Sequence, residues 1–217
     1  MTVSTNEIAT ERPSQAERRG ESDRRMMRAA ARLIARKGVA GTSLAEVGVA
    51  AGYSRGLPVE RYGTKLGLVR ALLAATESWF GDHLARTIAG RAGLAAIEWR
   101  VDAHLASVDR SNSATAALHA IYTASQSVMP ELRKPVAAFT DRWCAELVAH
   151  MREGQRSGEI ARDIDCAAEA RFLLAAMRGL MMQYLMDGSH RDLAKAKAIL
   201  LAHCRDRLAV AKARKST

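Results

Sequence analysis

The side chains most suited to binding an anion are concentrated in the first third of this 217-residue sequence. Between Arg12 and Lys65, twelve Lys and Arg residues stand against five Asp and Glu residues, out of a net charge of +10 for the whole chain. Guanidinium and ammonium groups donate hydrogen bonds to phosphate, and a basic cluster of this kind is typical of nucleic-acid-binding surfaces. The uneven distribution favours DNA as the partner over a protein that is basic throughout.

Residue patterns that would carry catalysis or hold a cofactor are not found in the sequence. It contains no phosphate-binding glycine loop, no G-x-S-x-G, no H-E-x-x-H and no paired carboxylates at a recognisable strand end. The six histidines are scattered. A single histidine on a helix is more often a packing residue than a ligand, so we expect neither an enzyme nor a metal or cofactor site.

Three widely spaced cysteines, Cys144, Cys166 and Cys204, form no C-x-x-C pattern. An odd number of cysteines without a disulfide framework predicts reduced thiols and hence a cytoplasmic protein. No apolar run approaches the ~20 residues that a membrane-spanning helix needs. The first residues also lack the apolar core of a signal peptide, so we expect the chain to be cytoplasmic.

Residues 42–57 have the pattern of two short helices joined by a tight turn. Thr42 or Ser43 can cap the first helix, because a side-chain oxygen there accepts a hydrogen bond from an otherwise unpaired backbone N–H. Gly52 suits the left-handed conformation that ends a helix, and Ser54 can cap the second helix. Two short helices with a glycine in the turn between them are the sequence form of a helix-turn-helix.

Together with its neighbours, this stretch resembles the tetracycline-repressor (TetR) family of bacterial transcription regulators, over roughly Arg24 to Leu73. The residues that carry the resemblance are Thr42-Ser43, Ala51 to Gly56, Tyr62 to Lys65, and Leu68. Gly48 departs from the family pattern, in which alanine is usual, and Val59 stands where an aromatic residue often touches phosphate. Pro58 falls inside the expected recognition helix, which it would kink or shorten unless it lies in the first turn.

The resemblance implies that the second helix of the motif enters the major groove of double-stranded DNA. Arg55 and Arg61 would donate to guanine O6 and N7 or to phosphate, and Lys65 would contact the DNA backbone. Tyr62 is expected to pack between helices. The predicted DNA-contacting residues are Arg24, Arg28, Thr42, Ser43, Tyr53, Ser54, Arg55, Gly56, Leu57, Val59, Arg61 and Lys65.

The first helix is predicted to be capped by Ser22 or Asp23 and to end after Lys37. Arginines recur along one of its faces at positions 24, 28, 32 and 36. Like charges at this spacing repel by about a few tenths of a kcal/mol each, which an anionic partner would relieve. The alternative is a solvated basic face. Residues 1–20 before this helix are predicted to form a flexible tail.

Apolar residues recur with the 3.6-residue period along the rest of the chain, and strand-like alternation is not found. The sequence therefore predicts an all-α protein. A helix from Lys65 to about Ala89 would start in the helix-turn-helix module and end in the next region, so we place the domain boundary inside it. The predicted units are a DNA-binding domain over residues 21–68, a helical regulatory and dimerisation domain over residues 69–211, and a basic tail over residues 212–217.

The resemblance also implies a small-molecule pocket among the middle helices, between about Gly93 and Gly179. Large or amphipathic side chains with a few polar groups are the candidates for its lining. These are Trp99, His104, His119, Tyr122, Gln126, Met129, Trp143, Phe172 and Met177. Each one could equally belong to an ordinary core, so the set predicts a location rather than a list of contacts.

The helix between Phe172 and Met186 is predicted to be apolar on nearly every side, which requires packing partners on every side. A last helix carries apolar residues from Leu193 to Leu208. Two copies of this helix pair would form a four-helix bundle about a twofold axis. We therefore expect a homodimer that uses these two helices as its interface.

These features predict a cytoplasmic, homodimeric transcription regulator that binds a palindromic DNA operator. The expected mechanism is that of a repressor released by a small-molecule effector, which binds better to a conformation with wrongly spaced recognition helices. The alternative is a basic helical protein that binds an acidic membrane surface or an acidic protein partner. Net charge and amphipathic helices fit that alternative, but the capped helix-turn-helix does not.

Overall fold

The computed structural model describes residues 14–106 and 113–210 of the chain. Within these ranges the protein consists of helices, with a single isolated β-bridge between Ile160 and Ala209, so the predicted all-α fold is confirmed. Residues 1–13 of the predicted tail and the predicted basic tail at 212–217 lie outside the described residues. No helix in the described ranges has the length and the apolar character needed to cross a bilayer.

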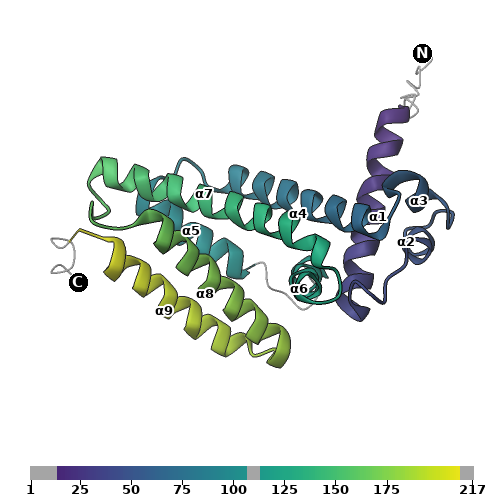
Figure 1. The fold of residues 1–217 in the computed structure, drawn as a ribbon. Helices are drawn as coiled ribbons and strands as arrows, with labels where there is room; N and C mark the ends of the chain where they lie inside the picture. The colour runs from purple at the N-terminus through teal and green to yellow at the C-terminus, as the bar shows by residue number, and fades with distance from the viewer. Residues whose placement is uncertain (1–13, 107–112, 211–217) are drawn as a thin grey trace, which may run out of the picture.

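Figure 1 shows the helices in an elongated arrangement, with α1 to α3 at one end and α8 and α9 side by side toward the other. In chain order the elements are α1 (Gln15–Lys37), α2 (Leu44–Ala50), α3 (Leu57–Tyr62), α4 (Lys65–Thr87), α5 (Gly93–Ala106), α6 (Ser113–Gln126), the 3-10 helix η1 (Pro130–Leu132), α7 (Arg133–Ser157), α8 (Cys166–Asp187) and α9 (His190–Leu208). The helix α4 starts beside α3 and continues into the C-terminal part, as its sequence pattern predicted.

The predicted start of α1 is wrong. Ser14 caps the helix: its Oγ accepts from the backbone N–H of Glu17 at 3.2 Å, and Glu17 Oε2 accepts from the Ser14 N–H at 2.7 Å. This reciprocal capping box satisfies two terminal groups at once and starts α1 about two turns before the predicted cap. Ser22 instead lies buried within the helix. Residues 14–20, predicted as tail, therefore belong to α1 or to its cap.

Three other helix ends are set by local sequence signals. Thr64 Oγ1 accepts from the backbone N–H of Gly67 at 3.1 Å and starts α4. Gly188, with φ +71°, ends α8 in the left-handed conformation, because a residue without Cβ adopts it without a clash. Asp165 caps the start of α8 by accepting two backbone N–H groups.

One continuous core links the two ends of the molecule. Buried residues of α1, such as Met26 and Ile34, belong to the same cluster as Leu72 and Phe80 of α4 and the apolar side chains of α5 to α9. The helix α6 packs directly against α1 (Figure 1). The helix-turn-helix end is therefore joined to the C-terminal part by α4 and also by the contact between α1 and α6.

Candidate DNA-binding surface and effector cavity

The turn between α2 and α3 has the backbone geometry of a helix-turn-helix. Gly52 has φ +82°, and the backbone N–H of Tyr53 donates to the carbonyl of Gly48 at 2.8 Å. Ser54 Oγ accepts from the backbone N–H of Leu57 at 3.3 Å, so this hydroxyl supports the start of α3 although the helix itself begins at Leu57. The turn is thus held by local hydrogen bonds on both sides.

The start of α2 is tied to the end of α1. Ser43 and Glu46 form a capping box, and Glu46 Oε1 also accepts from Lys37 Nζ at 2.5 Å. The hydrogen bond from Lys37, followed by those from Ser43, lowers the pKa of Glu46 to about 2. Glu46 is therefore ionised at neutral pH and joins the two helices through charge.

Gly48 departs from the usual alanine because two neighbours approach it closely. A Cβ atom on this residue would lie 2.4 Å from the carbonyl oxygen of Ser54 and 3.1 Å from Cδ of Pro58. Pro58 is the second residue of α3, within the first turn, where its missing N–H leaves no helix hydrogen bond unmade. Pro58 therefore starts the recognition helix rather than breaking it, and the glycine makes room for its ring.

Several predicted DNA-contacting residues are accessible around the turn. Ser43, Ser54, Arg55 and Gly56 are exposed, and Val59 on α3 is 51% exposed. Within the described ranges no carboxylate pairs with Arg55, so its guanidinium donors are available to a nucleic acid. The exposed side chain of Val59 offers an apolar surface of the kind that contacts a thymine methyl group.

Tyr53 and Leu57 are half-buried rather than open. Leu57 packs against the core, and the guanidinium carbon of Arg25 lies 5.5 Å from the ring centroid of Tyr53. Arg25 was not among the predicted residues, although it continues the arginine-rich start of α1 and is exposed. Its contact with Tyr53 adds a positive charge beside the turn.

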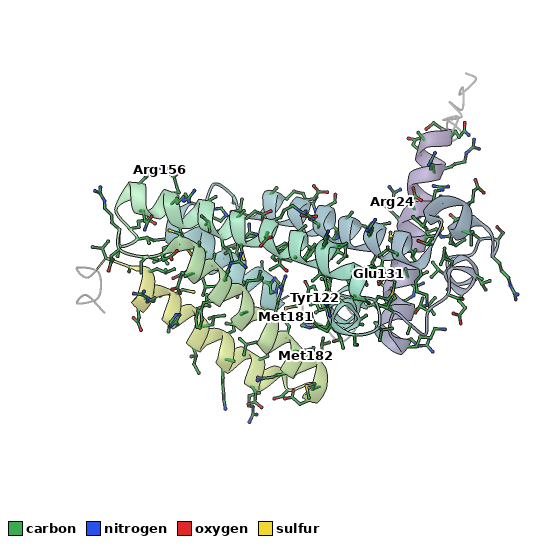
Figure 2. All side chains as sticks on the ribbon, viewed as in Figure 1. Arg24, Tyr122, Glu131, Arg156, Met181 and Met182 are labelled. Carbon is green, nitrogen blue, oxygen red and sulfur yellow. The ribbon has the colours of Figure 1, made fainter. Side chains whose placement is uncertain are left out.

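Three further residues predicted to contact DNA are accessible but already have a hydrogen-bonding or ionic partner within the protein. Arg24 and Arg28 pair with Glu21 at 2.8 and 3.5 Å, with side chains 66% and 64% exposed, so phosphate can compete for both (Figure 2 labels Arg24). Lys65 Nζ donates to the carbonyl of Ala40 at 2.8 Å. Two of the three ammonium protons of Lys65 remain for a phosphate.

Two side chains predicted to contact DNA are instead engaged inside the protein in this structure. Thr42 is only 2% exposed, and its hydroxyl donates to the carbonyl of Gly38 at 2.9 Å. The side chain of Arg61 is 17% exposed and donates to Asp23 Oδ1 at 2.8 Å. The hydroxyl of Tyr62 donates to the same oxygen at 3.1 Å, and burial, then the charge of Asp23, raises the pKa of Tyr62.

A small cavity lies between α5, α6, α7 and α8. Four of the predicted pocket residues line it: His104, His119, Tyr122 and Trp143. Its volume is about 30 Å³. That is room for one or two water molecules and far below the ~300–1,000 Å³ of a typical ligand pocket. The cavity lies where the family resemblance predicts a pocket, but it is too small for such a ligand.

The rest of the cavity lining was not predicted. It consists of Thr115, Leu118, Phe139, Leu174, Arg178 and Met181. Figure 2 shows Tyr122 and Met181 close to each other in the interior of the C-terminal part. The apolar members resemble any buried helical residue in sequence, and a single arginine in an apolar helix does not reveal which neighbour it faces.

Five predicted pocket residues do not line this cavity. Phe172 is 51% exposed on the outer side of α8, and Gln126 is exposed at the end of α6. Met177 is buried in the core without reaching the cavity, while Trp99 and Met129 pack against the core from its edge. Their size and polarity were suitable, but their positions on or beside the helices turn them away from the cavity.

Arg178 brings a positive charge to the cavity. Its Nη1 donates to Thr140 Oγ1 at 3.1 Å, and its guanidinium carbon lies 4.7 Å from the ring centroid of Tyr122. Its Nη2 is buried and makes no hydrogen bond. Within residues 14–106 and 113–210, no carboxylate forms an ion pair with this guanidinium.

Both cavity histidines are neutral at pH 7. Burial, followed by the charges of Arg178 and Arg100, lowers the pKa of His104 to about 3. Burial, followed by the charge of Arg178, also lowers the pKa of His119. Of the residues that line the cavity, Arg178 is therefore the charged one at neutral pH.

Aromatic contacts connect the cavity to α4. The ring centroid of Phe80 lies 4.5 Å from that of Trp143 and 5.8 Å from that of His104. On the opposite side, α6 carries His119 and Tyr122 and packs against α1. A ligand that displaced Trp143 or α6 would therefore act on helices that reach the helix-turn-helix.

The outer face of α8 carries an apolar stripe. Its exposed residues are Phe172, Ala175, Gly179, Met182 and Met186. Their spacing alternates between three and four positions, which is the spacing of a seam between packed helices. Met186 is 79% exposed, so this stripe has no cover within the described part of the chain.

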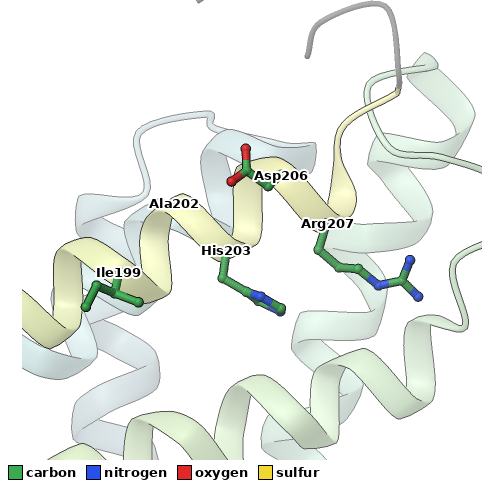
Figure 3. A pocket seen from close by; sticks show the side chains of 5 residues that line it. All are labelled: Ile199, Ala202, His203, Asp206 and Arg207. Atoms are coloured by element: carbon green, nitrogen blue, oxygen red, sulfur yellow. The ribbon is translucent and has the colours of Figure 1, made fainter.

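One face of the neighbouring α9 forms a shallow, open surface, made by Ile199, Ala202, His203, Asp206 and Arg207 (Figure 3). His203 and Arg207 project to the same side, where they approach Glu169 of α8 at 3.5 and 3.7 Å. No three His, Cys, Asp or Glu side chains gather to hold a metal ion here or elsewhere in the described ranges.

Comparison with sequence families gives two matches. Residues 26–72 match the profile of the bacterial regulatory proteins of the tetR family, and residues 94–209 match that of the C-terminal domain of BetI-type transcriptional repressors. The two matches together cover the helix-turn-helix and the helices that surround the cavity. No functionally curated protein matches the chain.

Solved structures share the fold at low sequence identity. A TetR transcriptional regulator from Chloroflexus aurantiacus is 23% identical, with a TM-score of 0.78, and the match covers 89% of this chain and 100% of that one. A TetR-family regulator from Rhodococcus sp. is 23% identical (TM-score 0.76; 84% and 96% covered). A transcriptional regulator from Saccharomonospora viridis, solved in complex with choline, is 21% identical (TM-score 0.75; 88% and 99% covered).

Proposed function

The chain belongs to the TetR family of bacterial regulatory proteins, and from this premise we propose that it is a dimeric repressor that a small molecule releases from a palindromic operator. Members of this family are DNA-binding transcription factors, not enzymes. The observation that carries the proposal of release is the direct contact of α6, which forms one wall of the cavity, with α1 of the helix-turn-helix.

DNA recognition is assigned to α3 and the residues around it. Arg55 and Val59 would meet base edges in the major groove, because Arg55 is exposed in the turn before this helix and Val59 is exposed in its first turn. Ser54 and Lys65 would bind phosphates on either side and set the register of the protein on the duplex. Arg24 at the start of α1 would add a phosphate contact after releasing Glu21.

The dimer is assigned to the outer faces of α8 and α9. A second copy related by a twofold axis would cover the α8 stripe and the open face of α9 with the same surfaces. The exposure of Phe172, Met182 and Ile199 supports this arrangement. The inward-facing leucines of α9, such as Leu200 and Leu208, are already buried within one protomer and cannot contribute to it.

Release would follow from a population shift. A ligand larger than the present cavity can bind only to a conformation in which the side chains around Trp143 have moved, and it stabilises that conformation by its differential affinity. Movement of α4 or α6 would change the distance between the two recognition helices of a dimer. A coupling of about 1–3 kcal/mol lowers DNA affinity by about 5- to 150-fold. The choline complex of a relative supports a small-molecule effector.

The proposal is tested by selecting the full-length protein against random duplex DNA and footprinting the recovered sequence. A palindromic site that protects two adjacent major grooves is the expected result. Anionic lipid vesicles serve as the control for general binding to negative surfaces. Equal affinity for the vesicles and for unrelated DNA, with no sequence enriched, would contradict a sequence-specific regulator. Compounds that bind the protein are then tested for release of the selected DNA.

A further inference from the structure

We propose that the effector carries an anionic group, such as a carboxylate, and that this group binds Arg178 in the cavity between α5, α6, α7 and α8. The inference rests on the proposed function only in treating this cavity as the effector site. It adds the chemical class of the ligand and the residue that selects it.

The guanidinium of Arg178 is a partly buried charge without a counterion in the described structure. Its hydrogen bond to Thr140 and its contact with the ring of Tyr122 satisfy only part of its donor capacity, and Nη2 is buried with no acceptor. An unpaired cation away from water and an unmade hydrogen bond both destabilise a protein. A carboxylate in the cavity would supply both the missing charge and the missing acceptor.

The remaining polar groups of the lining can support an anion but not neutralise Arg178. The cavity is lined by no Asp or Glu. His119 and Tyr122 lie with their rings 5.9 Å apart on α6, and a neutral imidazole and a phenol each have one hydrogen to donate. Together with Arg178 they form a set of donors with an excess of positive charge.

The same geometry disfavours a cationic effector. A quaternary ammonium group binds over the faces of aromatic rings. Here the face of Tyr122 is already covered by the guanidinium of Arg178 at 4.7 Å. A second cation would meet that charge in a poorly solvated site, where like charges repel strongly.

The rest of the effector is expected to be apolar. Phe139, Leu174 and Met181 line the cavity beside Arg178, together with the ring of Trp143. The present volume of about 30 Å³ admits only a group of the size of one or two waters. An apolar body must therefore displace side chains, and the flexible Met181 is the one that yields most easily.

The experiment uses two sets of small-molecule probes. Within each set the hydrocarbon part is similar and the charge of the polar group differs. Hexanoate, hexanamide and hexylammonium form one set, and benzoate, benzamide and benzylammonium form a second. Binding to the full-length protein is measured without DNA, by calorimetry and by the shift in Tm at millimolar concentration. We expect the carboxylate of at least one set to bind and to raise the Tm, and its amide and ammonium counterparts to fail.

Variants identify the residue responsible. Arg178→Met, which keeps an unbranched apolar stem but removes the guanidinium, should weaken carboxylate binding by about 10- to 100-fold, since hydrogen bonds to charged groups are the strong ones. Arg178→Lys keeps the charge and should retain part of the affinity. Arg171→Met is the matched control, because Arg171 lies on the same helix but is exposed and pairs with Asp141 at the surface.

The inference is overturned if the ammonium probes bind as well as the carboxylates, if no carboxylate binds, or if Arg178→Met binds them like the wild type. These outcomes are independent of operator binding. Sequence-specific DNA binding with no response to carboxylates would leave the proposed DNA recognition intact and reject the anionic effector. Carboxylate binding that does not release the operator would support an anionic ligand at Arg178 and reject the release mechanism.

Discussion

Arg61, near the end of the recognition helix, donates to the carboxylate of Asp23 in α1 at 2.8 Å. The bond joins residues 38 positions apart, and the hydroxyl of Tyr62 reinforces it on the same oxygen. The recognition helix is thereby attached to α1, the helix against which α6 packs. A movement transmitted from the cavity to α1 would therefore carry α3 with it.

The two arginines of the recognition segment should behave differently when removed. Arg55→Ala should weaken operator binding by about 1–3 kcal/mol and relax specificity at one base pair, since Arg55 is exposed and without an ion pair in the described structure. Arg61→Ala should instead lower the free energy of unfolding by about 1–3 kcal/mol, because it removes the charged partner of Asp23 and leaves its carboxylate with the hydroxyl of Tyr62. Quantitative footprinting and urea unfolding measure the two effects. Equal losses of stability in both variants would contradict this division.

Lys65 should act through phosphate rather than through bases. Lys65→Ala should weaken binding to all DNA sequences alike and reduce the slope of log K against log salt by about one unit. Arg156→Ala is the control, because this exposed arginine lies at the far end of α7 (Figure 2). A sequence-dependent effect of Lys65→Ala, or an unchanged slope, would rule out the phosphate contact.

Substitutions at two neighbouring methionines of α8 should distinguish dimer assembly from folding of the protomer. Met182 is on the exposed stripe, so Met182→Glu should place a charge in the dimer interface and yield folded monomers in sedimentation experiments. Met181 is 5% exposed and lines the cavity, so Met181→Glu should lower the Tm of the protomer itself. A dimer of wild-type affinity in the Met182→Glu variant would exclude this surface as the interface.

Acid should destabilise the protein through His104. Its pKa is about 3 in the folded state against 6.5 for an ordinary histidine, so the unfolded chain binds the proton more tightly. The stabilisation is complete above pH 6.5 and is lost as the pH falls from 6.5 toward 3, by up to ~1.4 kcal/mol per pH unit. Urea unfolding at several pH values should show a shallower pH dependence for His104→Leu. An identical slope in both proteins would contradict the assignment.

Two glycine-to-alanine changes should have opposite signs. Gly48→Ala should lower the free energy of unfolding by about 1–3 kcal/mol, because its Cβ would meet the backbone oxygen of Ser54 and the ring of Pro58. Gly81→Ala lies within α4, where a Cβ would meet nothing within 4 Å. It should raise stability by about 0.5–1 kcal/mol through the better helix propensity of alanine. Thermal unfolding of both variants measures the contrast, and a stabilising Gly48→Ala would refute the close approach.

Much of the fold could be predicted from the sequence because helix formation depends on neighbours along the chain. The cap of α2 at Ser43, the turn at Gly52 and the start of α4 at Thr64 involve residues within three or four positions of one another. The start of α1 is also encoded locally, since Ser14 and Glu17 have the spacing of a capping box. The predicted start at Ser22 or Asp23 was therefore wrong although the sequence carries the correct signal.

The residues that form the candidate sites could not all be predicted, because they depend on contacts between segments distant in the sequence. Sequence periodicity tells which residues of one helix share a face, but it does not tell which neighbour that face meets. Only tertiary packing turns Phe172 outward, buries Thr42, brings Asp23 to Arg61 and places Arg178 over Tyr122. The family, the all-helical fold and the basic DNA-binding end were thus determined by local pattern and composition. The small size of the cavity and the charge of Arg178 in its lining were decided by how the helices pack against one another.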